Sequence, residues 1–375
     1  MTRLIWRRWK GRLPTGIDRV CLAYLRHFGG RSHAVINHER FRTILNRQAS
    51  QELFGILENP PRRFRTRLIT GTLRHLRAFN EQGRERLYLN VGHTGLDSPG
   101  FGNWISRSRI RPVYLVHDLI PITHPQFCRT GEEERHRIRM RTVLETASGL
   151  IGNSQATIDE LSDFANSHRL PMPPAIAAWL GIGDLPQSAA GRTMQRPSFI
   201  TLGTIEGRKN HLLLLDIWSR LIDRLGNGAP RLLIIGQRGW KADVVFDRLD
   251  QDEKLRGHVI ELSRCSDKEL AQHLTSARAL LFPSLAEGYG LPLVEALSAG
   301  MPVIASDLPA LREIGGRIPT YLHAQDHSAW EDTIVDYTRP ESRTRAAQLD
   351  RMKGFCAPTW EWHFQKVEAW LSTLR

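Results

Sequence analysis

The sequence predicts an α/β protein built from two domains, each with a parallel sheet covered by helices. Short apolar runs rich in Val, Ile and Leu alternate with longer stretches of helical periodicity, which is typical of parallel α/β layers. The length of 375 residues suggests two domains, since one domain usually holds about 100–200 residues. A segment rich in Pro, Ala and Gly, from Pro171 to Pro197, is a candidate hinge between them.

The expected elements follow in order along each half. In the first half we expect strands at Arg86–Val91, Val113–His117 and Gly149–Asn153. In the second half we expect strands at Ser198–Leu202, Arg231–Gly236, Val259–Leu262, Ala279–Pro283 and Pro302–Ser306. Helical periodicity separates the strands, for example over His211–Leu225 and Asp267–Ser276. Two such domains joined by a linker would place a ligand in the cleft between them.

The net charge of +13 is distributed unevenly along the chain. Residues 1–190 hold 28 Lys and Arg against 16 Asp and Glu, a balance of +12, whereas residues 191–375 hold 24 against 23. A charged partner is therefore expected to contact mainly the N-terminal half. The charge alone would suit a nucleic-acid-binding protein, but the sequence has no helix-turn-helix, zinc module or RNA-binding sheet motif, so we reject this class and expect no nucleic acid.

Composition excludes several other classes. With 41% hydrophobic and 24% charged residues, the chain is globular rather than disordered. Its apolar runs are far shorter than the ~20 residues that span a bilayer, and no secretory signal is recognisable, which predicts a cytoplasmic protein. Its four cysteines are scattered without a CxxC pair, so we expect buried free thiols in a reducing compartment: Cys21, Cys128, Cys265 and Cys356.

The most informative stretch runs from Pro283 to Gly316, PSLAEGYGLPLVEALSAGMPVIASDLPALREIGG. A strand is expected to end at its beginning, and a glycine-rich loop then leads into a helix opened by Pro292. Glycines let backbone N–H groups approach a ligand, and the positive end of the helix points the same way, which suits a diphosphate. Glu287 in the loop and Glu295 in the first helical turn could accept hydrogen bonds from sugar hydroxyls. Alternatively, Glu295 only complements the helix dipole and Glu287 is solvated.

The frame EGYGLPLVE from Glu287 to Glu295, followed by AGMPVIAS, resembles family 4 of the retaining glycosyltransferases (group 1). The resemblance implies a GT-B fold, in which two Rossmann-like domains face each other across a cleft and the second holds most of the nucleotide-sugar donor. It implies an acceptor-side domain over residues 1–185, a donor-binding domain over 186–357 and a helix returning to the first domain over 358–375.

The same resemblance implies roles for individual residues. Glu295 would bind the donor ribose, and Glu287 would contact the transferred sugar near its reacting carbon. Gly290 and Leu291 would offer backbone N–H groups to the donor.

A second segment, TLGTIEGRKN at residues 201–210, is also similar to the family. Lys209 fits the family lysine that neutralises the donor diphosphate, and a fixed cation there would stabilise the leaving nucleoside diphosphate. Many members carry an arginine directly after the strand glycine, where this chain has Thr204. Arg208 either supplies that second charge or points into solvent. The segment resembles mannosyltransferases of bacterial surface polysaccharides, which favours GDP-mannose, although a UDP-sugar stays open.

The first domain carries weaker matches. PTGIDRV at residues 14–20 resembles the family's first strand-to-helix loop, with Gly16 where the backbone would come closest to the donor phosphate. His117, at the end of an expected strand, matches a family histidine near the transferred sugar, or else it is structural. His93 could line the acceptor side, and Ser154 is explained by helix capping alone.

The residue inventory fits a reaction without a metal or a further cofactor. A double displacement would need a carboxylate nucleophile under the sugar, and the sequence fixes none there. We expect instead a front-face reaction in which the leaving diphosphate takes the acceptor proton and the protein contributes positioning and charge stabilisation. The Asp-x-Asp of residues 250–252 lies in a polar stretch and is interpreted as a solvated turn rather than a metal site.

The arginine-rich stretch Arg62–Phe79 is expected to form a helix with apolar residues on one half of its surface and arginines on the other. Such a helix either lies on an anionic membrane surface or packs its apolar side into the domain core. In both cases the exposed arginines could recruit an anionic, lipid-diphosphate-linked acceptor.

Together these features predict a hexosyltransferase of bacterial surface polysaccharide synthesis, such as lipopolysaccharide, with mannose favoured. It would act on a glycan or lipid-linked acceptor in the cytoplasm or at the inner face of the cytoplasmic membrane. The alternatives are a non-catalytic nucleotide-sugar-binding protein and, by fold analogy alone, a GT-B phosphorylase or epimerase.

Overall fold

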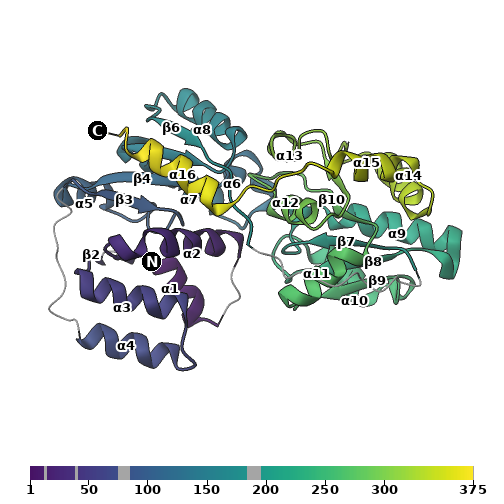
Figure 1. Cartoon of the computed structure of the whole chain (residues 1–375), viewed down its shortest axis with the longest axis horizontal. Helices are drawn as coiled ribbons and strands as arrows, with labels where there is room; N and C mark the ends of the chain where they lie inside the picture. Colours follow the sequence, from purple (N-terminus) through teal and green to yellow (C-terminus); the bar gives the residue numbers. More distant parts are fainter. Residues whose placement is uncertain (12–14, 39–40, 75–84, 184–195, 375) are drawn as a thin grey trace. The chain divides into compact units, whose positions relative to one another are not determined.

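A computed structural model describes residues 1–11, 15–38, 41–74, 85–183 and 196–374. These residues form two compact units, which Figure 1 shows coloured along the chain. The first unit comprises Met1–Leu119, Glu134–Leu180 and Trp360–Arg375, and the second comprises Ile120–Glu133 and Gly181–Thr359. The second unit therefore includes a short segment from the N-terminal half of the chain. The domain boundary expected between residues 185 and 186 falls outside the described residues.

The first unit is built on a parallel sheet with the strand order β3-β4-β5-β6. Its strands are β3 (Leu87–Asn90), β4 (Arg111–Val116), β5 (Gly149–Gly152) and β6 (Ala175–Ala177). A separate antiparallel pair consists of β1 (Val35–His38) and β2 (Phe41–Ile44). The helices of this unit are α1 (Thr2–Trp9), α2 (Gly16–Phe28), α3 (Arg47–Glu58), α4 (Phe64–Arg74), α5 (Phe101–Ser108), α7 (Glu132–Thr146), α8 (Gln155–His168) and α16 (Trp360–Leu371).

The three strands expected in this half are confirmed to within two residues, but two expectations are corrected. Part of the segment predicted to be a hinge forms β6, which pairs with β5 and completes the sheet, although the division between the two units, after Leu180, does fall within that segment. The loop at residues 14–20 was expected to follow a strand, whereas the helix α1 precedes it and residues 12–14 lie outside the described part of the chain.

The second unit is a six-stranded parallel sheet with the order β12-β11-β10-β7-β8-β9. Its strands are β7 (Ser198–Leu202), β8 (Arg231–Ile235), β9 (Val259–Leu262), β10 (Ala279–Phe282), β11 (Val303–Ser306) and β12 (Thr320–Leu322). Its helices are α6 (Ile120–Thr123), α9 (His211–Leu225), α10 (Asp243–Gln251), α11 (Asp267–Ser276), α12 (Leu291–Ser298), α13 (Pro309–Gly315), α14 (His327–Thr338) and α15 (Arg343–Met352). The five strands and the two helices expected in this half are confirmed, and β12 was not expected.

The buried core of the second unit explains why its strands and helices could be predicted from the sequence. Strand β7 is buried on both faces, and α9 covers it with an unbroken apolar stripe that includes Leu214 and Trp218. The Trp218 ring lies edge-on to Phe199, 5.9 Å between centroids, and its indole N–H donates to the Pro230 carbonyl at 2.8 Å. The burial of this much apolar and aromatic surface between α9 and the sheet fixes the position of α9 on the sheet.

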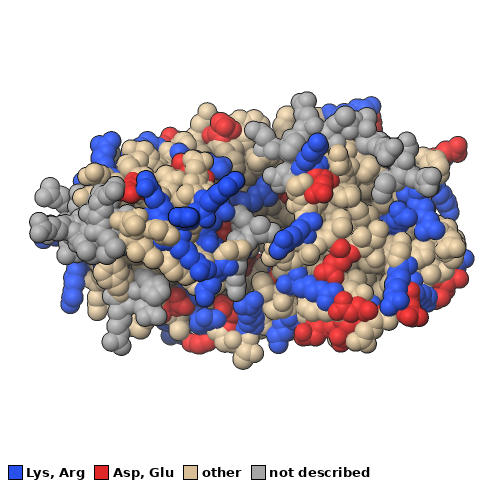
Figure 2. All heavy atoms as spheres, turned by 90° about the horizontal axis from the view of Figure 1, so that it is seen from below, with Lys and Arg blue, Asp and Glu red and all other residues tan. Residues whose placement is uncertain are grey.

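Charge and hydropathy of the surface bear on the expected environment of the protein. On the face drawn in Figure 2, Lys and Arg side chains lie in several groups over both units. No helix among the described residues is long and apolar enough to cross a membrane. Of the four free cysteines only Cys21 is buried, which corrects the expectation of four buried thiols.

The C-terminal helix α16 belongs to the first unit and packs on α2. Phe364 stacks on His27 with 3.9 Å between ring centroids and meets Tyr24 edge-on at 5.1 Å. The buried His363 ring contacts both sides of this junction: its Nε2 lies 2.8 Å from the Tyr24 hydroxyl, and its Nδ1 lies 3.0 Å from the Trp179 carbonyl. Because a carbonyl only accepts, Nδ1 carries the proton, and Nε2 accepts from Tyr24.

This neutral histidine predicts an acid-sensitive first unit. Burial lowers the pKa of His363 to about 4, below the ~6.5 of an unfolded histidine. The unfolded chain therefore binds a proton more readily, so the stabilisation is complete above about pH 6.5 and falls by up to ~3 kcal/mol towards pH 4. Urea unfolding between pH 7 and pH 4 should show this loss, and H363Q should show less of it. If H363Q kept the same pH dependence as the exposed control H327Q, the assignment would be wrong.

Candidate active site

In the second unit, the strand order shows where the loops after two neighbouring strands leave the sheet in different directions. Strand β10 lies directly beside β7, although β8 and β9 come between them in the chain. The connections from β7 and β10 therefore leave in opposite directions, and the carboxyl ends of these two strands flank a topological switch point. In open α/β sheets, ligands bind at this point. The two segments that the sequence analysis selected, after β7 and after β10, meet here.

Glycines shape the loop after β7. Gly203 has φ +123°, a conformation that side chains rarely adopt, and the Lys209 side chain lies within 4 Å of where its Cβ would be. A Cβ on Gly236 would lie 1.8 Å from the Gly203 carbonyl oxygen, so the two loops could not lie this close if residue 236 carried a side chain. The loop then forms a short 3-10 helix, Gly207–Lys209, which directs Lys209 inward.

Lys209 and Glu287 form a buried ion pair at the switch point. The Lys209 Nζ donates to Glu287 Oε1 at 2.5 Å, and both side chains are less than a tenth exposed. The same ammonium lies 4.5 Å from the centroid of the Phe282 ring, at the end of β10. The Leu285 N–H donates to the Arg208 carbonyl at 2.7 Å, which holds the two loops together.

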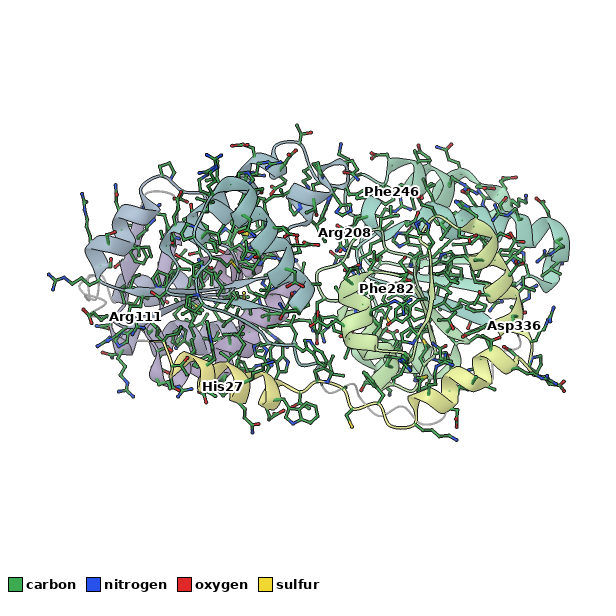
Figure 3. The ribbon with its side chains drawn as sticks, turned by 90° about the horizontal axis from the view of Figure 1, so that it is seen from above. His27, Arg111, Arg208, Phe246, Phe282 and Asp336 are labelled. Carbon is green, nitrogen blue, oxygen red and sulfur yellow. The ribbon has the colours of Figure 1, made fainter. Side chains whose placement is uncertain are left out.

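Arg208 joins the same cluster rather than pointing into solvent. Its Nη1 lies 2.9 Å from Glu287 Oε1 and donates to the Ala286 carbonyl at 2.9 Å, while its Nε lies 2.7 Å from Glu206 Oε1. Arg208 and Phe282 lie near each other at one edge of the second unit (Figure 3). Sequence reasoning missed Glu206, which is 4% exposed and sits inside the matched segment beside the two cations.

Burial and charge oppose each other in this cluster. Burial alone raises the pKa of Glu287, but Arg208 and Lys209 more than offset this effect and lower the pKa to about 2. Burial lowers the pKa of Lys209, against the opposing influence of Glu287, and burial raises the pKa of Glu206. Burial, together with the nearby Lys209, lowers the pKa of His211 to about 3, so this histidine is neutral. Glu287 is therefore an ionised acceptor held between two cations.

The helix α12 begins beside this cluster. Gly290 caps it with φ +101°, and a Cβ there would lie 2.5 Å from Leu311 Cδ2, so the position needs glycine. The helix starts at Leu291 with Pro292 in its first turn, as expected. Glu295 is its fifth residue and therefore lies just beyond the first turn in which we had placed it. Glu295 is buried, at 6% exposure. The alternative of a solvated carboxylate concerned Glu287, and it is wrong, because the Glu287 side chain is only 8% exposed.

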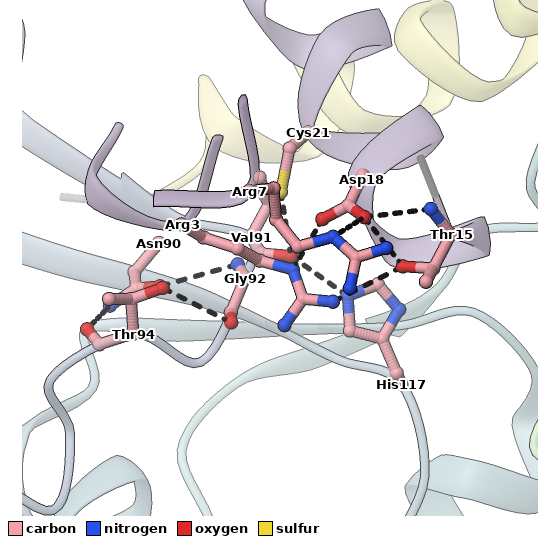
Figure 4. A network of polar contacts seen from close by, with 10 residues as sticks. All are labelled: Arg3, Arg7, Thr15, Asp18, Cys21, Asn90, Val91, Gly92, Thr94 and His117. Atoms are coloured by element: carbon pink, nitrogen blue, oxygen red, sulfur yellow. Dashed lines mark hydrogen bonds and ion pairs between the residues drawn. The ribbon is translucent and has the colours of Figure 1, made fainter. Parts of the chain in front are cut away.

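In the first unit, His117 lies at the end of β4 in a network that Figure 4 shows. It is buried, and its Nε2 lies 2.8 Å from the Val91 carbonyl at the end of β3. Because that carbonyl accepts, the proton is on Nε2, and Nδ1 is left as an acceptor. Burial lowers the pKa of His117, so the ring stays neutral.

The start of α2 lies in the same network. Gly16 is the first residue of α2, and Asp18 closes a capping box with Thr15. The Asp18 carboxylate also accepts from Arg3 Nε at 2.7 Å and lies 3.0 Å from Arg7 Nε (Figure 4). Sequence reasoning missed these arginines of α1, although Asp18 lies inside the segment that it singled out.

Two further predicted residues are held by local hydrogen bonds. The His93 ring lies 5.3 Å from that of His117, and its Nε2 is 2.9 Å from the Leu115 carbonyl. Ser154 caps α8 by accepting from the Thr157 N–H at 3.1 Å, as expected. The structure thus gathers Lys209, Arg208, Glu287, Gly290, Leu291 and Glu295 in the second unit, whereas Gly16 and His117 belong to the first.

The Asp-x-Asp of residues 250–252 lies at the end of α10, where the Asp250 side chain is exposed to solvent, as expected, and also forms an ion pair. Asp250 accepts two hydrogen bonds from Arg238, at 2.6 and 2.7 Å, and the same guanidinium bonds Glu261. Asp252 instead accepts from the Lys254 backbone N–H at 3.1 Å. Within the described ranges, no group of three or more His, Cys, Asp or Glu side chains is placed to hold a metal ion.

The buried ion pair predicts strong coupling between its two members. K209M should leave the Glu287 carboxylate without its closest partner and destabilise the second unit by about 3–5 kcal/mol, and E287Q should do the same to Lys209. The double variant should lose less than the sum of the two. Urea unfolding followed by the buried Trp218 measures this, with the exposed pair Lys254–Asp223 as control. Additive effects in K209M/E287Q would contradict the geometry.

The sequence of this chain is similar to those of known glycosyltransferases. Residues 187–329 match the family of glycosyl transferases group 1. Over 233 residues, 58% of this chain, the sequence is 30% identical to the serotype-specific mannosyltransferase WbdA of Escherichia coli, and the match covers 27% of that protein. It is 35% identical over 115 residues, 31% of this chain, to the O-antigen chain mannosyltransferase B of Escherichia coli, covering 30% of that protein. The chain thus matches less than a third of the length of either relative.

Solved structures show the same fold. HepE from Anabaena in complex with UDP-glucose matches with a TM-score of 0.65 and 15% identity, over 96% of this chain and 97% of that one. Sucrose-phosphate synthase from Thermosynechococcus elongatus matches with a TM-score of 0.58 and 18% identity, over 96% and 93%. The prediction of two Rossmann-like domains is therefore confirmed. Residues 187–329 thus resemble the group 1 glycosyltransferases, and the fold of the chain is GT-B.

Proposed function

We propose that the protein is a retaining glycosyltransferase that moves a hexose from a nucleoside-diphosphate sugar to a glycan or lipid-linked acceptor. The observation that carries this proposal is the buried cluster of Lys209, Arg208 and Glu287 at the switch point, beside the start of α12. The relatives that are named as mannosyltransferases favour mannose, and hence GDP-mannose, in the synthesis of a bacterial surface polysaccharide. HepE is described with UDP-glucose, which keeps a UDP-linked donor as the alternative.

The donor diphosphate would lie against the two cations and the helix end. Lys209 and Arg208 neutralise its charge, and Gly290 and Leu291 offer backbone N–H groups where the α12 dipole is positive. The buried Glu295 is proposed to bind the ribose hydroxyls. Glu287, ionised and held by two cations, is proposed to accept from hydroxyls of the transferred sugar.

In this proposal the two cations contribute to the reaction by stabilising charge. As the glycosidic bond breaks, negative charge grows on the leaving diphosphate, and the fixed cations stabilise it. Since the carboxylate of Glu287 is engaged with Lys209, we propose a front-face reaction in which the leaving phosphate takes the acceptor proton, with no metal and no protein nucleophile. From the first unit, Gly16 would approach the phosphate, and the unprotonated Nδ1 of His117 can accept from a sugar hydroxyl.

Donor turnover tests this assignment. With a panel of GDP- and UDP-sugars, K209A and E287A should each lower kcat/KM by about 10²–10³-fold, because each removes charge from the reacting centre. The control K254A, whose ammonium pairs with the exposed Asp223, should leave the rate unchanged, and excess chelator should do the same.

Three outcomes would overturn the assignment or part of it. Unchanged rates in both K209A and E287A would refute the site. A rate lost to chelator and restored by manganese would refute the metal-free reaction. Donor binding without turnover of any sugar would favour a non-catalytic nucleotide-sugar-binding protein.

We further propose that the first unit docks on an anionic membrane surface or lipid-linked acceptor through α1 and α4. The apolar Trp6 and Ile69 are 44% and 49% exposed, and Arg63 and Arg67, close to Ile69 in the chain, are exposed as well. Phe64 is buried, so part of the apolar side of α4 packs into the unit, and residues 75–79 of the expected helix lie outside the described residues. Arg65 donates to the Trp9 carbonyl at 2.8 Å and joins the two helices.

Sedimentation with vesicles tests this surface. The protein should bind vesicles of anionic lipid and not those of phosphatidylcholine, and high salt should release it. R63A/R67A should weaken binding about tenfold or more, since each cation contributes ~1 kcal/mol near such a surface. The control R256A/R343A removes two arginines of the second unit and should bind as before. Equal binding to both lipids, or to neither, would exclude the membrane surface.

A further inference from the structure

Three histidine rings lie together in the first unit, beside the carboxyl ends of β3 and β4. The His93 ring is 5.3 Å from that of His117 and 5.8 Å from that of His136 in α7, measured between ring centroids. In the part of the chain that the structure describes, no three His, Cys, Asp or Glu side chains are placed to hold a metal ion, so the rings are not arranged as a metal site. The reaction proposed above uses His117 and leaves His93 without a role.

Hydrogen bonds that cross between the two strands fix the rings of His93 and His117. The His93 Nε2 lies 2.9 Å from the carbonyl of Leu115 in β4, and the His117 Nε2 lies 2.8 Å from the carbonyl of Val91, directly after β3 (Figure 4). Since a carbonyl only accepts, each Nε2 carries a proton. No described residue forms a hydrogen bond with either Nδ1. Two ring nitrogens are therefore held at the edge of a parallel sheet where ligands bind.

The His93 ring is neutral and within reach of a ligand. Desolvation in the fold lowers its pKa well below the ordinary value, and the positive charges that His117, His136 and Arg139 can carry lower the pKa further. Arg139 is itself paired with Asp97 at 2.9 Å. His93 is only partly buried, so its ring can be reached from solvent. Its Nδ1 thus accepts from an uncharged donor such as a hydroxyl group.

His93 adopts a backbone conformation that favours glycine. Its φ of +56° lies in the left-handed region, which costs free energy for a residue with a side chain. The loop around it is tight: a Cβ on Gly92 would lie 3.2 Å from Arg3 Cδ, and a Cβ on Gly95 would lie 2.1 Å from Asn37 Nδ2. Glycine would meet the backbone requirement at position 93 without that cost. Residues held in such conformations cluster at ligand-binding sites, so the imidazole here indicates a role for the side chain.

We infer that His93 binds the acceptor, by accepting a hydrogen bond at Nδ1 from a hydroxyl group of the acceptor sugar. The inference rests on the proposed function and adds a substrate-binding residue to it. The groups proposed to hold the donor lie mainly in the second unit, whereas His93 and His117 both belong to the first. This division favours the acceptor, rather than the donor, as the source of the hydroxyl.

Two substitutions separate sugar binding from a purely structural role of the ring. In H93N the amide oxygen can take the place of Nδ1, and asparagine tolerates a positive φ, but the bond to Leu115 is lost. In H93Q the amide reaches the place of Nε2, where it still donates to Leu115, but the acceptor at Nδ1 is lost. H93Q should therefore raise the KM for the acceptor by about 3–10-fold, the effect of one lost hydrogen bond, and H93N should raise it less.

The assay uses the panel of donors with the methyl glycosides of mannose, glucose, galactose and N-acetylglucosamine as acceptors. H93Q should raise the KM for the acceptor without raising the KM for the donor. The matched control is H363Q, which replaces another buried neutral histidine of the first unit and should leave the acceptor KM unchanged. An unchanged acceptor KM in H93Q, or a larger rise in H93N than in H93Q, would overturn the inference. So would a rise in the donor KM alone, which would assign the hydroxyl to the donor.

Nitrogen-15 NMR of the histidine rings tests the same contact without turnover. One of the methyl glycosides should move the Nδ1 signal of His93 to higher field, because the nitrogen then accepts a hydrogen bond, and this signal should be missing in H93Q. No movement with any of the four glycosides would overturn the inference. Movement in a protein that turns over no donor would support this inference while contradicting the proposed glycosyl transfer, so the two failures are distinguishable.

Discussion

The arrangement of the second unit depends on one interaction, the buried ion pair between Lys209 and Glu287 with Arg208 beside it. Two charges taken out of water are stable only if each has a close partner and further hydrogen bonds. Here the carboxylate lies between two cations, and Arg208 also bonds Glu206 and a backbone carbonyl. The loops after β7 and β10 must therefore keep the positions that bring these groups together.

The conformation of the surrounding backbone brings the loops after β7 and β10 close enough for these contacts. Gly203 and Gly236 let two loops approach within a distance that a side chain would block, and Gly290 turns the chain into α12. The strand order sets β7 beside β10, so that segments 78 residues apart contribute to one cluster. A preformed arrangement of this kind needs little reorganisation when a charged ligand arrives, which is the physical basis for proposing that it holds a diphosphate.

Much of this could be predicted from the sequence, for identifiable reasons. Strands such as Ala279–Phe282 are continuous apolar runs, and the helix His211–Leu225 has an uninterrupted periodic face, so local pattern and burial agree. The motifs around Lys209 and Glu287 identified each of these residues separately. Their direct contact was not predicted, because it depends on tertiary geometry. Short strands such as β6 and β12, with three residues each, leave too little pattern to recognise. Arg3 and Arg7 could not be assigned because they act through Asp18 on another helix.

The central claim is that this cluster binds a diphosphate, and calorimetric titration of GDP and UDP tests it most directly. Whichever nucleotide binds more tightly should lose about tenfold or more in affinity in K209A, since a charged hydrogen bond contributes about 1.5–3 kcal/mol. The corresponding nucleoside, which lacks phosphate, should bind the variant and the unchanged protein equally. Equal affinity of K209A and the unchanged protein for the diphosphate would contradict the account.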